Sequence, residues 1–432
     1  MSEASRARPT ALRRILHAVP FALGAITAGR LWSIHHGSNL VPVVEEMALT
    51  GFWWLFAVIL ACAFMASRHA DHLAQRLGEP MGTIVLTLSA IVIEVAMVSA
   101  VMLGGEADPS VARNTMFATL MIILNGLVGL ALLIGGWQRH EQSFNLQSSS
   151  TYLSLLIPLA AITLVLPTFS RNLMMDGTEL EGSMTLQLEI FLGIACLLVY
   201  AAFLWLQTSR YRSFFSATPA GEETPHEVAS LQVHEHVEES NREMELLARL
   251  EMRFDDEDDL VFEKSSRAGE AADCHLRAPT EETPPAWRSG SLLLAHLFLV
   301  VLLAEHVGEE MTGMLTAAEL PLALTGVLVA VLILAPEGLA AVMSAKRDSM
   351  QRTMNILLGS ALSTIGLTVP AVLLLSVWLD SPVALGLRPA EIVLLVTTLL
   401  LCMNNFLRGK VNTMQGIVHL TLFLTYCVLL FD

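Results

Sequence analysis

Apolar stretches long enough to cross a membrane recur along this chain of 432 residues. A spanning α-helix needs about 20 apolar residues, and charged residues make up only 15% of the sequence, against about 25% in soluble domains. A soluble enzyme, a disordered chain and a disulfide scaffold are therefore excluded. We expect an all-α polytopic membrane protein with about 11 transmembrane helices. The stretches are 13–29, 48–66, 82–104, 115–136, 151–169, 185–207, 291–304, 321–345, 354–379, 390–406 and 412–431.

The first and seventh stretches differ from the rest. Arg13-Arg14 precedes a short apolar run with small residues, so the first stretch fits a retained helix or a secretory signal. The seventh is short and ends at Glu305-His306. Either interpretation of the first stretch leaves the same orientation for the helices that follow.

Basic residues around the stretches predict the orientation of the chain. With the N-terminus inside, fifteen Lys and Arg residues flank the inner ends of the stretches and four flank the outer ends. Since basic residues favour the cytoplasmic side, we expect a multi-pass protein of the cell inner membrane with an external C-terminus.

One internal segment carries most of the negative charge. Of the net charge of −16, the residues between Ser213 and Trp287 contribute 19 acids and six bases. This acidic segment is either a solvated cytoplasmic linker or an element that senses cations, but it lacks the ligand spacing of an EF-hand. The acidic balance argues against nucleic-acid binding.

Five stretches lie on each side of the acidic segment once the first stretch is set aside. An odd number of helices per half places the halves in opposite orientations, as in the inverted repeats of many secondary transporters. The predicted domains are 1–35, an N-terminal tail and helix; 36–212, the first repeat; 213–289, the acidic loop; and 290–432, the second repeat.

The second stretch of each half contains a carboxylate deep in an apolar run, Glu94 and Glu337. A charge there is expensive, so such residues usually face a cavity and serve transport; the alternative is a protonated Glu that packs two helices together. Pro336 and Gly338 flank Glu337, and the proline predicts a kink or a break in that helix. The next stretch also matches between halves, with Asn125 and Ser363 each nine residues beyond a matched Met.

With these residues, the sequence resembles those of the calcium/proton exchanger family within the cation/calcium exchanger superfamily. It is most similar to the ChaA-type sodium(calcium)/proton antiporters. The similar segments are Arg68-His-Ala-Asp71, Leu77-Gly-Glu-Pro80, Ile93-Glu94-Val95, Pro336-Glu337-Gly338 and Gly359 to Pro370. The resemblance implies an antiporter that exports calcium, sodium or potassium in exchange for protons, with no cofactor beyond the transported cation.

In this resemblance, Glu94 and Glu337 bind the cation and the protons, and Asn125 and the Ser360/Ser363 region supply secondary ligands. Many relatives have Gly-Asn-Ala-x-Glu around each glutamate, whereas here Ala90-Ile-Val-Ile93 and Ile333-Leu-Ala-Pro336 stand before them. Without the asparagines the oxygen shell is poorer, which leaves calcium, sodium and potassium all open.

Other polar residues have an ordinary interpretation beside a functional one. One group, at the inner mouth of the third stretch, is either a solvated interface or a cation vestibule and consists of Asp71, Glu79, His69 and His72. A second group is either a solvated helix end or an acidic outer mouth and consists of Glu305, Glu309 and Glu310. The lone histidines His296, His306 and His419 are more often packing residues than proton relays.

No sequence motif indicates an enzyme or an ATP-driven pump, because H-E-x-x-H, G-x-S-x-G and G-x-x-x-x-G-K-[ST] are all missing from the sequence. The expected partners are inorganic cations, protons and the lipid bilayer, and a homo-oligomer is left open. Two rival functions remain: a passive cation channel that uses the same carboxylates, and a membrane sensor or scaffold that acts through the acidic loop.

Overall fold

The first half of the chain forms five helical rods after a separate short helix, Val19–Leu31. The computed structural model describes residues 19–31, 48–77, 81–104, 109–138, 141–170, 173–175, 178–180, 183–209, 286–379 and 383–431. The five rods are α2 (Ala48–Leu77); α3 (Met81–Gly104); α4 (Val111–Met121), η1 (Ile122–Leu127) and α5 (Val128–Gln138); α6 (Leu146–Ala160), η2 (Ala161–Val165) and α7 (Leu166–Phe169); and α8 (Leu186–Thr208).

The second half also forms five rods, so each predicted apolar stretch coincides with a helix wherever it is described. These rods are α11 (Ala286–Ala317); α12 (Leu324–Lys346); α13 (Met350–Ser363), η3 (Thr364–Thr368) and α14 (Val369–Leu379); α15 (Pro389–Phe406); and α16 (Thr413–Leu429). Four short strands lie between rods: β1 (Gln142–Ser143) pairs with β4 (Lys410–Val411), and β2 (Leu173–Met175) pairs with β3 (Thr178–Leu180), both antiparallel.

Within the described residues, nine helices are long and apolar enough to cross a membrane. Val19–Leu31 and Thr413–Leu429 are also apolar but shorter than a full span, in the same described part of the chain. The protein is therefore a multi-pass, all-α membrane protein. The acidic segment lies outside the described residues up to residue 285, and the predicted domain boundaries stay predictions.

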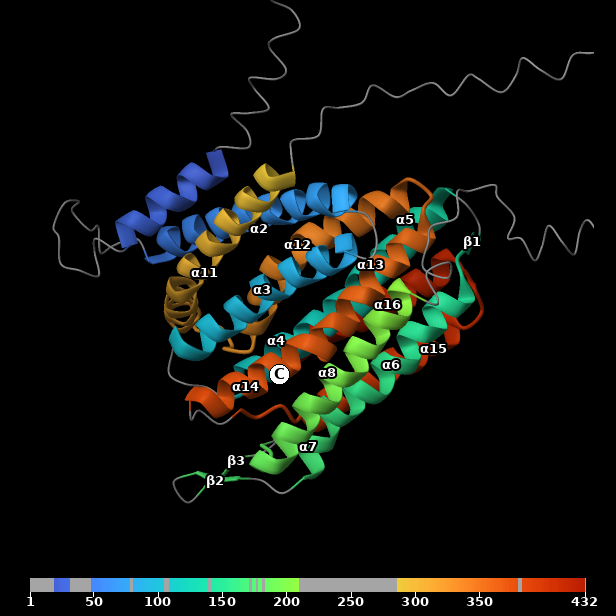
Figure 1. The fold of residues 1–432 in the computed structure, drawn as a ribbon. Coiled ribbons are helices and arrows are strands. Elements are labelled where there is room, and N and C mark those ends of the chain that lie inside the picture. Colours follow the sequence, from blue (N-terminus) through green and yellow to red (C-terminus); the bar gives the residue numbers. More distant parts are fainter. Residues whose placement is uncertain are drawn as a thin grey trace, which may run out of the picture. The chain divides into compact units, whose positions relative to one another are not determined.

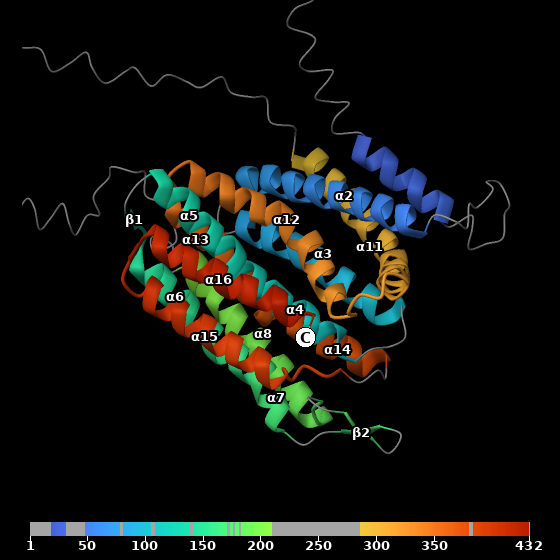
Figure 2. The ribbon, with the colours of Figure 1, turned by 180° about the vertical axis from the view of Figure 1, so that it is seen from behind.

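The two halves pack against each other through equivalent pairs of rods. The first rods, α2 and α11, lie side by side, and each also contacts the second rod of the other half, α12 and α3. The third rod of each half contacts the fifth rod of the other half: α5 and η1 touch α16, and α14 and η3 touch α8. Figures 1 and 2 show α2, α11 and Val19–Leu31 grouped on one side of the bundle and α15 and α16 on the opposite side.

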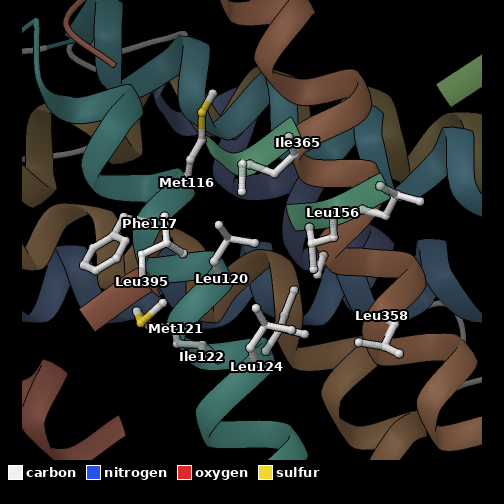
Figure 3. Close-up of a cluster of buried hydrophobic side chains, with 14 of the residues drawn as sticks. Met116, Phe117, Leu120, Met121, Ile122, Leu124, Leu156, Leu358, Ile365 and Leu395 are labelled. Carbon is white, nitrogen blue, oxygen red and sulfur yellow. The ribbon is translucent and has the colours of Figure 1, made fainter. Parts of the chain in front are cut away.

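The third rods form the centre of the bundle, and their side chains make the larger hydrophobic core. Figure 3 shows part of this cluster, in which Phe117, Leu120 and Met121 of the first-half third rod lie together with Leu395 of α15 and Ile365 of η3. Because lipid is as apolar as these side chains, close packing rather than water exclusion holds the rods together here. Gly326 of α12 illustrates this, since a Cβ built there would lie 2.6 Å from the carbonyl carbon of Asn114 on α4.

Each third rod contains a segment of π-helix, η1 and η3, and the fourth rod of the first half contains η2. Two of these segments end just before a proline, Pro370 after η3 and Pro167 after η2. Proline has no N–H and clashes with the carbonyl four residues earlier, so a locally wider turn relieves the clash. These turns were not predicted from the sequence, although a proline follows two of the three.

Two sequence-based expectations about helices need revision. Helix α12 runs unbroken from Leu324 to Lys346 with Pro336 inside it, so the break that the proline suggested is absent, while the kink stays a prediction. Helix α11 does not stop at Glu305-His306 but continues to Ala317. Carboxylates end an apolar span without ending a helix, so hydropathy marked the limit of the span and not of the helix.

Candidate functional site

Glu94 lies in the middle of α3, a helix whose other residues are mostly apolar. Its side chain is only 4% exposed. The hydroxyls of Thr364 and Thr368, on η3 of the other half, lie within electrostatic range of its carboxylate, as does Glu337. Thr368 Oγ1 is buried and has no hydrogen bond of normal geometry within the described part of the chain.

Glu337 occupies the equivalent rod of the second half, α12. Ser360 Oγ on α13 donates a hydrogen bond of 2.5 Å to Glu337 Oε2. Asp71, near the end of α2, also lies within electrostatic range of the Glu337 carboxylate. Glu337 is thus held between the third rod of its own half and the first rod of the other half.

A single helix face supplies the hydroxyls around both carboxylates. Ser360, Thr364 and Thr368 follow one another at intervals of four residues on α13 and η3, and residues four apart share a face of a helix. Ser360 lies beside Glu337, and the two threonines lie beside Glu94. The site is therefore a pair of carboxylates from two different rods, with one row of hydroxyls from a third.

A cavity of about 370 Å³ reaches Glu337 from the ends of α2, α8 and α13. Ser360, Ser363 and Glu337 line its inner part together with Ser89 of α3. Its remaining polar lining consists of Ser67, Asp71, Thr87, Tyr152, Tyr200, Gln207, Thr208, Arg352 and Asn355. Glu94 is not part of the lining, although its neighbours Ala90 and Ile93 are.

Asn125 belongs to a different polar network. Its Nδ2 donates to Thr398 Oγ1 at 2.8 Å, and its Oδ1 lies 3.3 Å from His419 Nδ1. His419 Nε2 in turn lies 3.2 Å from Asn405 Nδ2. All four side chains are buried, so this network joins η1 to α15 and α16 on the side away from the cavity lining.

The sequence of the chain matches the family model described as "Sodium/calcium exchanger protein" over residues 47–209 and 289–431. These two matched segments cover the ten rods apart from the first three residues of α11. The chain belongs to this exchanger family. Members of the family are transporters, so the protein is an antiporter of cations and not an enzyme.

Two relatives match the exchanger over nearly its whole length. It is 32% identical to the "Sodium-potassium/proton antiporter ChaA" of Escherichia coli K12 over 95% of both chains. It is also 32% identical to the "Putative ionic transporter y4hA" of Sinorhizobium fredii, over 90% of this chain and 91% of that one. The solved structure of native YfkE shares the fold, with a TM-score of 0.63, 17% identity and coverage of 96% of this chain and 98% of that one.

The exchanger brings together only some of the residues that the sequence singled out. Glu337, Ser360, Ser363 and Asp71 line the cavity, and Glu94 lies beside it. The vestibule role of Asp71 stays a prediction. Asn125 points its amide into the network with Thr398, and its assignment as a cation ligand stays a prediction.

The remaining vestibule candidates are only partly described. Glu305 and Glu309 lie within the continuous helix α11, but their side chains fall outside the described residues, as does the whole of Glu79. The rings of His69 and His296 are tilted by 38° against each other at the α2–α11 contact, with their centroids 5.4 Å apart, and neither residue lines the cavity.

Sequence reasoning missed Thr364 and Thr368, although the four-residue spacing from Ser360 was visible. Among the described residues, no group of three or more His, Cys, Asp or Glu side chains could hold a metal ion. A cation at this site would therefore be bound by two carboxylates and neutral oxygens.

Proposed function

We propose that this exchanger exports calcium, sodium or potassium across the cell inner membrane in exchange for protons, and that Glu94 and Glu337 bind the cation and the protons in competition. The observation that carries the proposal is the pair of carboxylates itself. They come from equivalent rods of the two halves, interact electrostatically and lie among apolar helices.

An ionised side chain among apolar helices in the membrane has an unfavourable free energy. Two ionised carboxylates close together among apolar helices repel each other and are poorly solvated. Either a cation or protons can neutralise them, so occupancy by one excludes the other. This competition couples the two fluxes without any direct contact between cation and proton, and a passive channel has no need of it.

The unequal exposure of the two glutamates supports alternating access. Glu337 lines the cavity, whereas Glu94 is buried behind it against η3. We infer that the cavity is the cytoplasmic entrance, because Arg68, Arg76 and Arg352 lie near its end of the bundle and basic residues favour the cytoplasmic side. Access from the other side then requires the rods around Glu94 to move.

Everted membrane vesicles containing a pH-sensitive dye test this function directly. After the vesicles are acidified, pulses of calcium, sodium and potassium are added separately. We expect dequenching with at least one cation, because its entry drives protons out of the lumen. A membrane with an equal amount of the Glu94→Gln/Glu337→Gln double variant is the control.

Three outcomes decide between the candidate functions. Cation uptake that is measured with an isotope but moves no protons would indicate a channel. Equal dequenching in the double variant would show that the carboxylates are not the coupling site. No response to any cation, with inserted protein, would contradict antiport and favour the sensor or scaffold.

A further inference from the structure

The mouth of the cavity carries a positive charge on the path that a cation would take. Arg352 stands in the first turn of α13 and lines the cavity together with Ser360, eight residues further along the same rod. Eight residues of helix span about 12 Å. A cation that enters from this end therefore passes Arg352 before it reaches Ser360 and Glu337.

Arg352 belongs to a series of charges that leads inward. Its guanidinium lies within electrostatic range of Asp71, and Asp71 lies within range of Glu337. His72 also acts on Asp71. Among the described residues, no ion pair joins Arg352 to a carboxylate, and Arg352 is an exposed side chain. Within that part of the chain, its charge is therefore not neutralised by direct contact with a carboxylate.

We propose that Arg352 is a specificity-determining residue, whose fixed positive charge at the cavity mouth weakens the binding and entry of divalent cations more than of monovalent cations. The inference rests on the proposed cation transport and deepens it, because it names sodium and potassium as the favoured class of substrate. Asp71 acts in the opposite direction by attracting cations to the same mouth.

The physical basis is that a Coulomb energy scales with the charge of the ion. For a unit charge about 10 Å away in a water-filled mouth, removing Arg352 should improve monovalent binding about two-fold and divalent binding about four-fold. The divalent change is the square of the monovalent change, whatever the distance. A change in local shape has no reason to follow this relation.

Four variants separate charge from structure. Arg352→Lys keeps the charge, so the ratio of calcium affinity to sodium affinity should not change. Arg352→Gln removes the charge and should raise this ratio, and Arg352→Glu reverses the charge and should raise it further. Asp71→Asn should lower the ratio. Arg347→Gln removes an exposed charge five residues away, at the end of α12 and outside the cavity lining, and is the matched control with no expected effect.

The affinities are measured in two ways, so that this inference and the proposed function can fail separately. Half-saturating concentrations of calcium, sodium and potassium come from dequenching in vesicles. The same ions are titrated against the thermal stability of purified protein, which reports binding without any proton movement. Both are repeated with added choline chloride, which should shrink the effect because salt screens exposed charges over about 8 Å.

Equal fold-changes for calcium and sodium in Arg352→Gln would overturn the inference. So would a change of similar size in Arg352→Lys, which would show a structural role, or in Arg347→Gln, which would show a general surface potential. If proton flux fails in the wild type but the thermal titrations show the squared relation, the specificity role stands and proton coupling falls. If the calcium-to-sodium affinity ratio is the same in the thermal titrations of every Arg352 variant, the specificity role of Arg352 is overturned whatever the vesicle result.

Discussion

Replacement of a single carboxylate is the sharpest test at the scale of residues. Glutamine at Glu94 or Glu337 keeps the shape of the side chain but cannot gain or lose a proton, so we expect coupled exchange to fall to background. Aspartate keeps the charge on a shorter arm, so it should retain partial exchange with weaker cation affinity. The measurement is cation-driven dequenching in vesicles with matched amounts of protein.

A packing role for these glutamates predicts the reverse order, because Gln replaces a hydrogen-bonding neutral acid better than Asp does. Glu189→Gln is the control, since Glu189 is a buried carboxylate in α8 that does not line the cavity. Robust exchange in Glu94→Gln or Glu337→Gln would reduce that residue to a structural role. A buried polar change can cost about 1–3 kcal/mol, so insertion and stability are checked first.

Residue type and depth in an apolar run were enough to single out both glutamates, whose roles stay predictions, but not the groups around them. Asn125 and Ser363 occupy matched positions in the sequence, yet Ser363 lines the cavity and Asn125 bonds Thr398 and lies beside His419. The third rods are buried on nearly all sides, so any of their faces accepts a polar residue that finds a partner. Which face looks into the cavity depends on the rods of the other half.

At the scale of elements, Gly326 tests how closely α12 must approach α4. Alanine there would bring a Cβ within 2.8 Å of three backbone atoms of Asn114 and Thr115. Backbone cannot move aside as a flexible side chain does, so α12 has to shift. Overpacking of this kind costs about 1–3 kcal/mol, and we expect the melting temperature of Gly326→Ala in detergent to fall by several degrees.

Gly193→Ala is the matched control, because a Cβ at Gly193 in α8 meets nothing within 4 Å. Alanine favours a helix over glycine by up to about 1 kcal/mol, so this variant should be as stable as the wild type or slightly more stable. If Gly326→Ala and Gly193→Ala have the same melting temperature, the close approach of α12 and α4 is not needed for stability. Exchange by Gly326→Ala should fall as well, since α12 carries Glu337.

The elements themselves were largely predictable because hydropathy is a local property that bilayer thickness imposes. All eleven apolar stretches coincide with helices where they are described, and the five rods of each half appear as expected. The π-helical segments and the unbroken α12 were not predicted. Both depend on how neighbouring rods support a turn next to Pro370 or Pro336, and a sequence window contains no information about those neighbours.

At the scale of the whole molecule, exchange of contacts between the halves explains why the site lies where it does. Glu94 of the first half meets η3 of the second, and α12, which carries Glu337, packs on α4, η1 and α5 of the first. Neither half can form the site alone. Because the halves are expected to have opposite orientations, we propose that equivalent movements of the rods expose the same pair of carboxylates to either side.

The orientation of the molecule in the membrane is predicted by its basic residues. With fifteen Lys and Arg residues on the inner flanks against four on the outer flanks, the acidic segment should be cytoplasmic. A single cysteine at Ser265, in a chain whose five native cysteines are replaced, should resist an impermeant maleimide in intact cells and react after permeabilisation. Thr178→Cys, in the β2–β3 hairpin on the predicted outer side, should react in both. Labelling of Ser265→Cys in intact cells would show that the topology is the reverse of the predicted one. The cavity with Arg352 at its mouth would then open to the exterior.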